Sequence, residues 1–327
     1  MFNDPPLLFA LNDNRVFGEQ VGHWLGAAPA SHEEREFDGG EHKARTLASV
    51  RGKDVFVVQS LHGEAAHSAN DKLCRLLFFI GALRDAAAAR VTALVPYLAY
   101  ARKDSRTNPH DPVTTRYVAA LFEAVGTDAV VTLDVHNRSA FQNAFRCRNE
   151  HLDAGHLFIQ HFQSILHGGD VAVVSPDAGG VKRANLFRNS LAAALQAPVG
   201  SAFCEKYRKG DLLSGELLVG EVGGKSAIIF DDMIGSGQTT ARAARACRAH
   251  GAQRVYAAAT HGLFAKGAAA ALADAALDGI VVTDSVAQYR IEQDTPEGLT
   301  VLSCSALFAE AVKRMHTDGS VSELSIW

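Results

Sequence analysis

Short apolar runs rich in β-branched residues recur along the chain and alternate with longer stretches of helical periodicity. Apolar runs of about four to eight residues, bounded by polar or turn residues, are typical of strands buried on both faces. Eight segments show this pattern: 7–11, 55–60, 90–96, 129–134, 171–177, 226–232, 254–261 and 279–285. Helical patterns lie between many of them, at 70–88, 114–125, 182–195 and 239–250. This alternation predicts an α/β protein with mainly parallel sheets flanked by helices.

Two domains are expected from the length of the chain and from a change in composition near its middle. The chain has 327 residues, enough for one large or two medium domains. The segment 145–170 is richer in His, Arg and polar residues than its neighbours, and a new series of strands and helices begins at 171. We therefore predict a domain of residues 1–150 and a second of residues 151–305.

The overall composition and charge exclude several kinds of partner. Hydrophobic residues make up 47% of the chain and the formal charge is −4, with no block of like charge. This balance argues against nucleic-acid and membrane partners, although an anionic small molecule needs only a local basic site. The N-terminal MFNDPPLLFALND has no signal-peptide character, and no apolar run approaches the about 20 residues that span a bilayer. Five cysteines lie far apart without a C-x-x-C pair, which favours a reducing cytoplasm.

Polar residues stand at the ends of many of the predicted strands. They are Gln59, Asp134, Asp177, Asp231, His261 and Asp284. Ligands of open α/β sheets bind beyond the carboxyl ends of the strands, so a site at these residues is expected. For any one of them the alternative is that the strand simply reaches water there.

The stretch DDMIGSGQTT (231–240) combines two carboxylates with a loop of small residues and hydroxyls. A strand, a loop with Gly235 and Gly237, and a helix from about Thr239 would direct several backbone N–H groups and the positive end of a helix dipole at one point. Such a loop suits a phosphate, and carboxylates before it suit vicinal hydroxyls or a bridging Mg²⁺. A phosphorylated sugar has both features. The alternative is a helix capped by Ser236 or Thr239, with no ligand.

DDMIGSGQTT also resembles the phosphoribosyl-diphosphate-binding motif of the type I phosphoribosyltransferase fold. Four further segments resemble one branch of that fold, the ribose-phosphate diphosphokinases: RGKDVFVVQS (51–60), PYLAYARKD (96–104), VVTLDVHN (130–137) and VVSPDAGGVKRA (173–184). The similarity extends from about Phe37 to the C-terminal AEAVKRMHTDGSVSEL (309–324). An ordinary phosphoribosyltransferase would share the first motif alone, so the five motifs in this order are specific.

The resemblance implies that the chain transfers the diphosphoryl group of Mg·ATP to the 1-hydroxyl of ribose 5-phosphate, giving phosphoribosyl diphosphate and AMP. The loop residues Gly235, Ser236, Gly237, Gln238 and Thr239 would hold the 5-phosphate. Asp231 and Asp232 would face the ribose hydroxyls. His136 and Asp177 match the family's Mg²⁺-binding positions. Lys206 and Arg208, in CEKYRKGDLLSGE, match the catalytic K-x-R pair of a flexible loop, and glycines at 210 and 215 suit a mobile lid.

The resemblance also implies an ATP site in the first domain. Arg102, Lys103 and Asp104 fall in the segment that contacts ATP, and Gly39, Gly40 and Glu41 fall in a loop that contacts adenine from a neighbouring subunit. Four positions depart from the family's usual residues. The family has aspartate where this chain has Gly39, and glutamine where it has Lys103. It has an acid where this chain has Gly235, and glycine where it has Gln238.

The family's architecture implies two similar phosphoribosyltransferase-type domains with the active site between them. A C-terminal helix at about 306–320 would return to the first domain, and dimers would assemble into a homo-oligomer, a hexamer in the family. Two alternatives stay open. One is a catalytically silent regulatory paralogue, favoured by Gly39, Gly235 and Gln238 but not by the retained acids and cations. The other is a phosphoribosyltransferase that consumes phosphoribosyl diphosphate. Such an enzyme needs a segment that recognises the base, and the sequence shows none.

Overall fold

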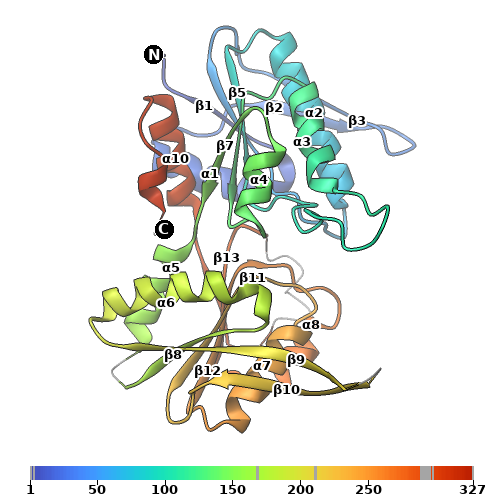
Figure 1. The fold of residues 1–327 in the computed structure, drawn as a ribbon. Coiled ribbons are helices and arrows are strands. Elements are labelled where there is room, and N and C mark those ends of the chain that lie inside the picture. Colours follow the sequence, from blue (N-terminus) through green and yellow to red (C-terminus); the bar gives the residue numbers. More distant parts are fainter. Residues whose placement is uncertain are drawn as a thin grey trace. The chain divides into compact units, whose positions relative to one another are not determined.

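The computed structural model describes residues 2, 4–166, 169–209, 212–287, 296 and 298–325, without the side chains of 206–209 and 212–216. The chain divides into two compact units (Figure 1). Unit 1 comprises Met1–Asp153 together with Ser303–Ser325, and unit 2 comprises Ala154–Leu302. The C-terminal segment therefore belongs to the same unit as the N-terminus.

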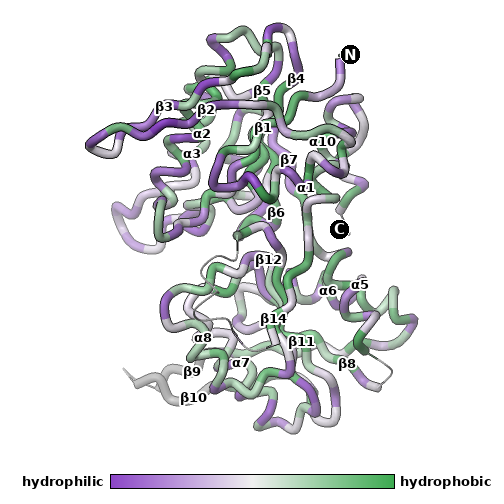
Figure 2. The backbone as a smooth tube through the Cα atoms, turned by 180° about the vertical axis from the view of Figure 1, so that it is seen from behind, coloured by the Kyte–Doolittle hydropathy of each residue, from purple (hydrophilic) through white to green (hydrophobic). Residues whose placement is uncertain are grey.

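Unit 1 is built on a five-stranded sheet in which every pair of neighbouring strands is parallel. In spatial order the strands are β1 (Leu7–Ala10), β4 (Asp54–Val58), β5 (Arg90–Val95), β6 (Ala129–Leu133) and β7 (Arg148–Leu152). A separate antiparallel hairpin joins β2 (His32–Glu36) to β3 (His42–Thr46). Figure 2 shows the backbone of this hairpin mostly in the hydrophilic colour, whereas the strands of the sheet are largely hydrophobic.

Helices cover both faces of the unit 1 sheet because successive strand residues point to opposite faces. Val55 and Val57 of β4 belong to one core with α2 (Ala69–Asp85), α3 (Thr114–Ala124) and α4 (Arg138–Ala144). The other face carries α1 (Arg15–Leu25) and α10 (Ser305–His316), which pack together. Phe17 of α1 meets Phe308 of α10 edge to face, with ring centroids 5.6 Å apart.

The end of α10 is fixed to the unit 1 sheet by a buried carboxylate. Asp54, whose side chain is fully buried, accepts hydrogen bonds from Nε and Nη2 of Arg90 at 2.7 and 2.6 Å. His316 Nδ1 lies 2.8 Å from Asp54 Oδ2, and Arg90 Nη2 donates to the Met315 carbonyl at 2.8 Å. A charged group can be buried when it is paired in this way.

Unit 2 is built on a seven-stranded sheet. In spatial order the strands are β10 (Leu212–Gly220), β9 (Val199–Lys209), β8 (Val171–Ser175), β11 (Ser226–Ile234), β12 (Arg254–Gly262), β13 (Gly279–Thr283) and β14 (Leu299–Leu302). The β9–β10 pair is antiparallel and all the others are parallel. α5 (Gly155–Ile165) and α6 (Val181–Leu195) cover one face, and α7 (Gln238–Ala249) and α8 (Ala268–Ala273) cover the other (Figure 1).

Aromatic rings fill the space between the unit 2 sheet and α5 and α6. Phe230 of β11 stacks on Phe187 of α6, with centroids 4.1 Å apart, and meets Phe158 of α5 edge to face at 5.6 Å. The opposite core under α7 consists mostly of small residues, such as Ala241 and Ala244. None of the helices in the described part of the chain is long and apolar enough to cross a membrane.

Candidate functional site

The acid pair of DDMIGSGQTT lies where strand β11 extends beyond its neighbour β8. The register of β11 with β8 ends at Ile229, whereas pairing with β12 continues to Ile234. The sequence predicted that the strand would end at the acids, and this prediction is wrong by two residues because β12 still pairs with β11 there. Asp231 and Asp232 therefore sit on a regular strand at the carboxyl edge of the sheet, where parallel α/β sheets bind ligands.

Arg183, in the first turn of α6, contacts both acids. Its Nη1 donates to Asp231 Oδ1 at 2.9 Å and to Asp232 Oδ1 at 3.0 Å. The Asp232 side chain is 3% exposed and the Asp231 side chain 22%. Burial raises the pKa of the Asp231 carboxyl above its ordinary range, the charge of Asp232 raises it further, and Arg183 opposes both effects. The guanidinium therefore favours the ionised form of the pair.

Sequence reasoning missed Arg183, although the segment VVSPDAGGVKRA was singled out. A signal was present: a basic residue in the first turn of a helix that follows a strand-end aspartate is placed to face that same edge of the sheet.

Asp177, the predicted metal ligand of unit 2, lies near Gly180, as Asp231 of the acid pair does. It follows β8 and accepts a hydrogen bond from the Gly180 N–H at 3.1 Å, which caps the short 3-10 turn η2 (Ala178–Gly180). A side chain at Gly180 would stand 3.9 Å from carboxylate oxygens of both Asp177 and Asp231. The Cβ of that side chain would stand 2.7 Å from Ser175 Oγ, so the close approach of Ser175 is what favours glycine here.

Residues 235–237 lead directly into α7, and this helix begins without a side-chain cap. Gly237 is the N-cap residue, in the left-handed conformation at φ +73°, and no side chain of the described residues caps the helix. The predicted alternative, a cap by Ser236 or Thr239, is therefore wrong. The first N–H groups of a helix have no partner within the helix, so they can bind an anion.

The two glycines of this loop differ in what surrounds them. A Cβ at Gly237 would lie 2.9 Å from Leu272 Cγ and 3.2 Å from the Ala268 carbonyl, both in α8, whereas a Cβ at Gly235 would meet nothing within 4 Å. Ser236 and Gln238 are exposed and Thr239 is half-buried. The loop thus needs glycine at 237, while the position where the family has an acid is spacious.

The predicted catalytic pair, Lys206 and Arg208, belongs to the antiparallel β9–β10 hairpin. The backbone of Lys206 pairs with Glu216, and that of Arg208 with Leu213. The sequence predicted a flexible loop here, but the two residues extend strand β9 because β10 pairs along it. Their side chains, and the predicted lid glycine Gly210, lie outside the described residues.

In unit 1 the predicted ATP segment and the predicted metal ligand follow neighbouring strands. Arg102 is exposed after β5, and His136 is exposed after β6. Asn137 Nδ2 donates to Asp104 Oδ2 at 2.7 Å, which joins the two segments. Lys103 Nζ instead contacts Asp111 Oδ2 at 2.6 Å, and hydrogen bonds, first from Lys103, hold the pKa of Asp111 well below its usual range.

The remaining predicted ATP residues lie at the tip of the β2–β3 hairpin. Gly39 and Gly40 have φ of +92° and +87°, which glycine adopts at no steric cost. The Phe37 N–H donates to the Glu41 carbonyl at 2.8 Å and closes the loop. Glu41 is exposed at the end of this loop.

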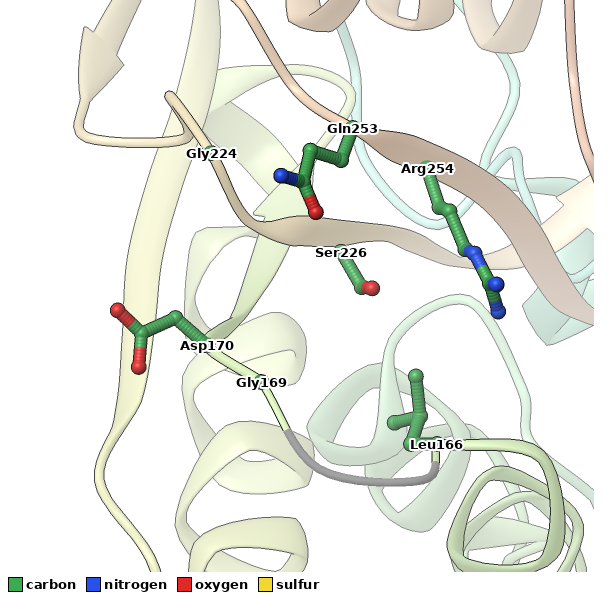
Figure 3. A pocket seen from close by; sticks show the side chains of 7 residues that line it. All are labelled: Leu166, Gly169, Asp170, Gly224, Ser226, Gln253 and Arg254. Carbon is green, nitrogen blue, oxygen red and sulfur yellow. The ribbon is translucent and has the colours of Figure 1, made fainter.

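A shallow pocket lies at the other edge of the unit 2 sheet, at the amino ends of β8, β11 and β12. It is lined by Leu166, Gly169, Asp170, Gly224, Ser226, Gln253 and Arg254. Figure 3 shows the charged side chains of Asp170 and Arg254 on opposite sides of it, so its charged groups do not converge. None of the predicted site residues lines this pocket.

Comparisons with known proteins place the chain in a family. The profile of the N-terminal domain of ribose phosphate pyrophosphokinase matches residues 7–126, and that of the phosphoribosyl synthetase-associated domain matches residues 214–325. A ribose-phosphate pyrophosphokinase of Brucella melitensis is 37% identical over 97% of this chain and 99% of its own length. One of Caldanaerobacter subterraneus is 36% identical over 97% and 96%.

A solved structure agrees with the sequence comparison. The crystal structure of phosphoribosylpyrophosphate synthetase from Mycobacterium smegmatis matches with a TM-score of 0.87 and 33% identity, covering 97% of this chain and 100% of that one. The chain belongs to the ribose-phosphate pyrophosphokinase family of enzymes. The predicted family and the predicted fold, two phosphoribosyltransferase-type α/β domains, are confirmed.

Proposed function

We propose that the protein transfers the diphosphoryl group of Mg·ATP to the 1-hydroxyl of ribose 5-phosphate. The observation that carries this proposal is the carboxyl edge of unit 2, where the uncapped start of α7 lies next to the carboxylates of Asp231 and Asp232. One end of this edge suits an anion and the other suits hydroxyl groups. Ribose 5-phosphate has both, and the relatives are named for a reaction of this sugar phosphate.

In this proposal the backbone N–H groups at the start of α7 bind the 5-phosphate, assisted by the hydroxyls of Ser236 and Thr239. Asp231 and Asp232 accept hydrogen bonds from the ribose hydroxyls. Arg183 supports this role because it holds both carboxylates and favours their ionised form. A carboxyl that kept its proton would offer one O–H donor and fewer acceptor sites to the sugar hydroxyls.

The carboxylates of unit 2 fit a magnesium ion carried by ATP. No group of three or more potential ligands forms a preassembled metal centre in the described residues. Mg²⁺ is usually held by one or two carboxylates together with substrate phosphates and water, so Asp177 beside Asp231 is a suitable donor set. We assign Asp177 to Mg²⁺ in unit 2 and, within unit 1, His136 to Mg²⁺ as well. When bound, it would neutralise charge on the phosphate oxygens.

The chemical step needs positioned cations rather than a protein nucleophile. The ribose 1-oxygen forms a bond to the β-phosphorus, the bond from that phosphorus to the oxygen shared with the α-phosphorus breaks, AMP leaves and the hydroxyl proton is released. We assign Lys206 and Arg208 to the charge that develops on the transferred group. Arg102, Lys103, Asp104 and the loop Gly39–Glu41 are assigned to ATP.

The direct test is to incubate the protein with ATP, Mg²⁺ and ribose 5-phosphate and to measure AMP and phosphoribosyl diphosphate. We expect Lys206→Ala to slow turnover at least about 100-fold, with little change in affinity for the sugar phosphate, because its contact strengthens in the transition state. If the wild-type protein forms AMP no faster than Lys206→Ala does, the proposal is refuted. Equal losses of turnover and affinity would refute the role of Lys206.

Two other outcomes of that assay correspond to the alternative functions. A regulatory paralogue would bind ribose 5-phosphate without forming AMP and would change the activity of a catalytic relative in a mixture. A phosphoribosyltransferase would consume phosphoribosyl diphosphate when a nucleobase is added. We further propose that the enzyme works as a homo-oligomer, which sedimentation would measure directly.

A further inference from the structure

His67 lies between two carboxylates that belong to different elements of unit 1. Its Nδ1 stands 2.8 Å from Asp13 Oδ1, in the 3-10 turn η1 (Asn12–Asn14), and its Nε2 stands 2.9 Å from Glu36 Oε1, at the end of β2. A carboxylate can only accept, and a neutral imidazole has one N–H and one bare nitrogen. Both contacts are favourable when both ring nitrogens carry protons, so this geometry favours the charged imidazolium.

The charges around His67 agree with a positive ring. The acidic groups that surround it are Asp13, Glu34, Glu36 and Asp71, and the basic groups are Arg75 and His42. Nearby Glu64 is already paired with Lys72 and His62. Partial burial opposes the charge, but hydrogen bonds to Asp13 and Glu36 outweigh it and hold the pKa of His67 above its ordinary value.

Glu36 joins this network to the loop at the tip of the hairpin. Glu36 and His42 form the last strand pair before the loop 37–41. Glu36 also accepts a hydrogen bond from Arg75 Nη2 at 2.7 Å, and the His42 ring stacks on Phe78 of α2 with centroids 5.6 Å apart. Both residues at the base of the loop are thus fixed to groups around α2.

The exposure of these side chains shows which contact can be lost most easily. The Glu36 side chain is 57% exposed, whereas Arg75 is 9% and His67 20% exposed. Glu36 therefore competes with water for its partners, and its position depends on how many charged donors it keeps. Loss of the proton from His67 would turn an attractive contact into one between two lone pairs.

We propose that His67 in its charged form is a positioning residue that holds the loop Phe37–Glu41 in place for the adenine of ATP. The proposal rests on the proposed function in one respect, the assignment of this loop to ATP. It predicts that affinity for ATP falls as the pH rises through the titration of His67, because the neutral ring releases Glu36.

Nucleotide affinity of matched variants tests this role. Binding of α,β-methylene ATP with Mg²⁺ is measured by calorimetry from about pH 6 to about pH 9, a range in which histidine titrates and lysine does not. We expect His67→Gln to raise Kd about tenfold at the acidic end, the effect of losing one charge-assisted hydrogen bond, and to remove the change with pH. His67→Lys keeps the charge and should bind tightly throughout. His23→Gln, exposed on α1 outside the network, should behave as the wild type.

The protonation of His67 in the wild type is measured separately, from the ¹⁵N shifts of its imidazole. A ring that titrates at or below the ordinary 6.5 overturns the proposal, whatever the variants do. Unchanged affinity in His67→Gln, or no binding of the analogue by the wild type, overturns the positioning of the loop. Binding that follows the predicted pH curve in a protein that forms no AMP would refute the proposed reaction and leave this role of His67 standing.

Discussion

Replacing Arg183 with methionine removes the nitrogen that donates to both Asp231 and Asp232 while keeping an apolar chain of similar length. Hydrogen bonds to charged groups contribute roughly 1.5–3 kcal/mol each. The bond to Asp232, whose side chain is 3% exposed, should fall within that range, and the bond to the more exposed Asp231 should contribute less. If the loss of these hydrogen bonds weakens ribose 5-phosphate binding by about 2 kcal/mol, KM for ribose 5-phosphate rises roughly 30-fold.

The pH dependence gives this prediction a sign. Burial and Asp232 already raise the pKa of Asp231, and Arg183 opposes them, so its removal raises that pKa further. The acid pair of Arg183→Met then becomes fully ionised at a higher pH than in the wild type. Because the pKa of Asp231 is raised to about 8 in the wild type, we expect the loss of affinity for ribose 5-phosphate to be largest between about pH 8 and the higher pKa of the variant, and to shrink above that range.

Arg183→Lys is the matched control. Both hydrogen bonds come from Nη1, so a single ammonium nitrogen can contact both acids, and this variant should recover most of the lost affinity. Steady-state kinetics with varied ribose 5-phosphate at several pH values measure all three proteins. An unchanged KM in Arg183→Met, or a KM increase that does not vary with pH, would show that Arg183 does not control the charge of the acids.

Other substitutions follow from the geometry of the loop and of the buried carboxylate. Gly237→Ala should lower the unfolding free energy by about 1–3 kcal/mol and weaken ribose 5-phosphate binding, because it is strained at positive φ and meets Leu272. Gly235→Ala, in open space, should change stability by less than about 0.5 kcal/mol; equal effects in urea unfolding would contradict this difference. Asp54→Asn should cost about 3 kcal/mol in the same assay, because it removes the buried negative charge and one of the two oxygens that pair with Arg90. A loss below about 1 kcal/mol would mean that the pair is not buried in solution.

Most of the parallel strands could be predicted from the sequence, because a strand that is buried on both faces consists of a continuous apolar run. The run 129–134, for example, corresponds to β6 (Ala129–Leu133), in which all residues are buried. The hairpin strand β2, with the sequence HEERE, has no apolar alternation, since its contacts are ion pairs and hydrogen bonds such as that of Glu36 with Arg75. Strand β9 (Val199–Lys209) was not among the predicted strands, because charged residues fill its second half, which pairs with an antiparallel neighbour.

Sequence motifs identified the acids and the phosphate loop but not the groups that hold them. Asp231 and Asp232 are recognisable because they follow an apolar run, whereas Arg183 reaches them from 48 residues away in sequence. The same limit applies to Lys103, whose partner Asp111 became visible only when the intervening loop was folded. Pairwise contacts between distant segments depend on the path of the chain, which no local pattern contains.

The return of α10 to unit 1 has a consequence for how the protein is made. Among the residues that the structure describes, unit 2 is one continuous stretch of chain, whereas unit 1 needs residues on both sides of it. The surface of α1 that meets Phe308 therefore stays uncovered while Ala154–Leu302 is synthesised, roughly 7–30 s at about 5–20 residues per second. Unit 1, whose synthesis begins first, can therefore complete its folding only after unit 2 has been synthesised. Chaperones that bind exposed apolar surface should meet this protein mainly through α1, and chains ending before α10 should misfold in unit 1 rather than in unit 2.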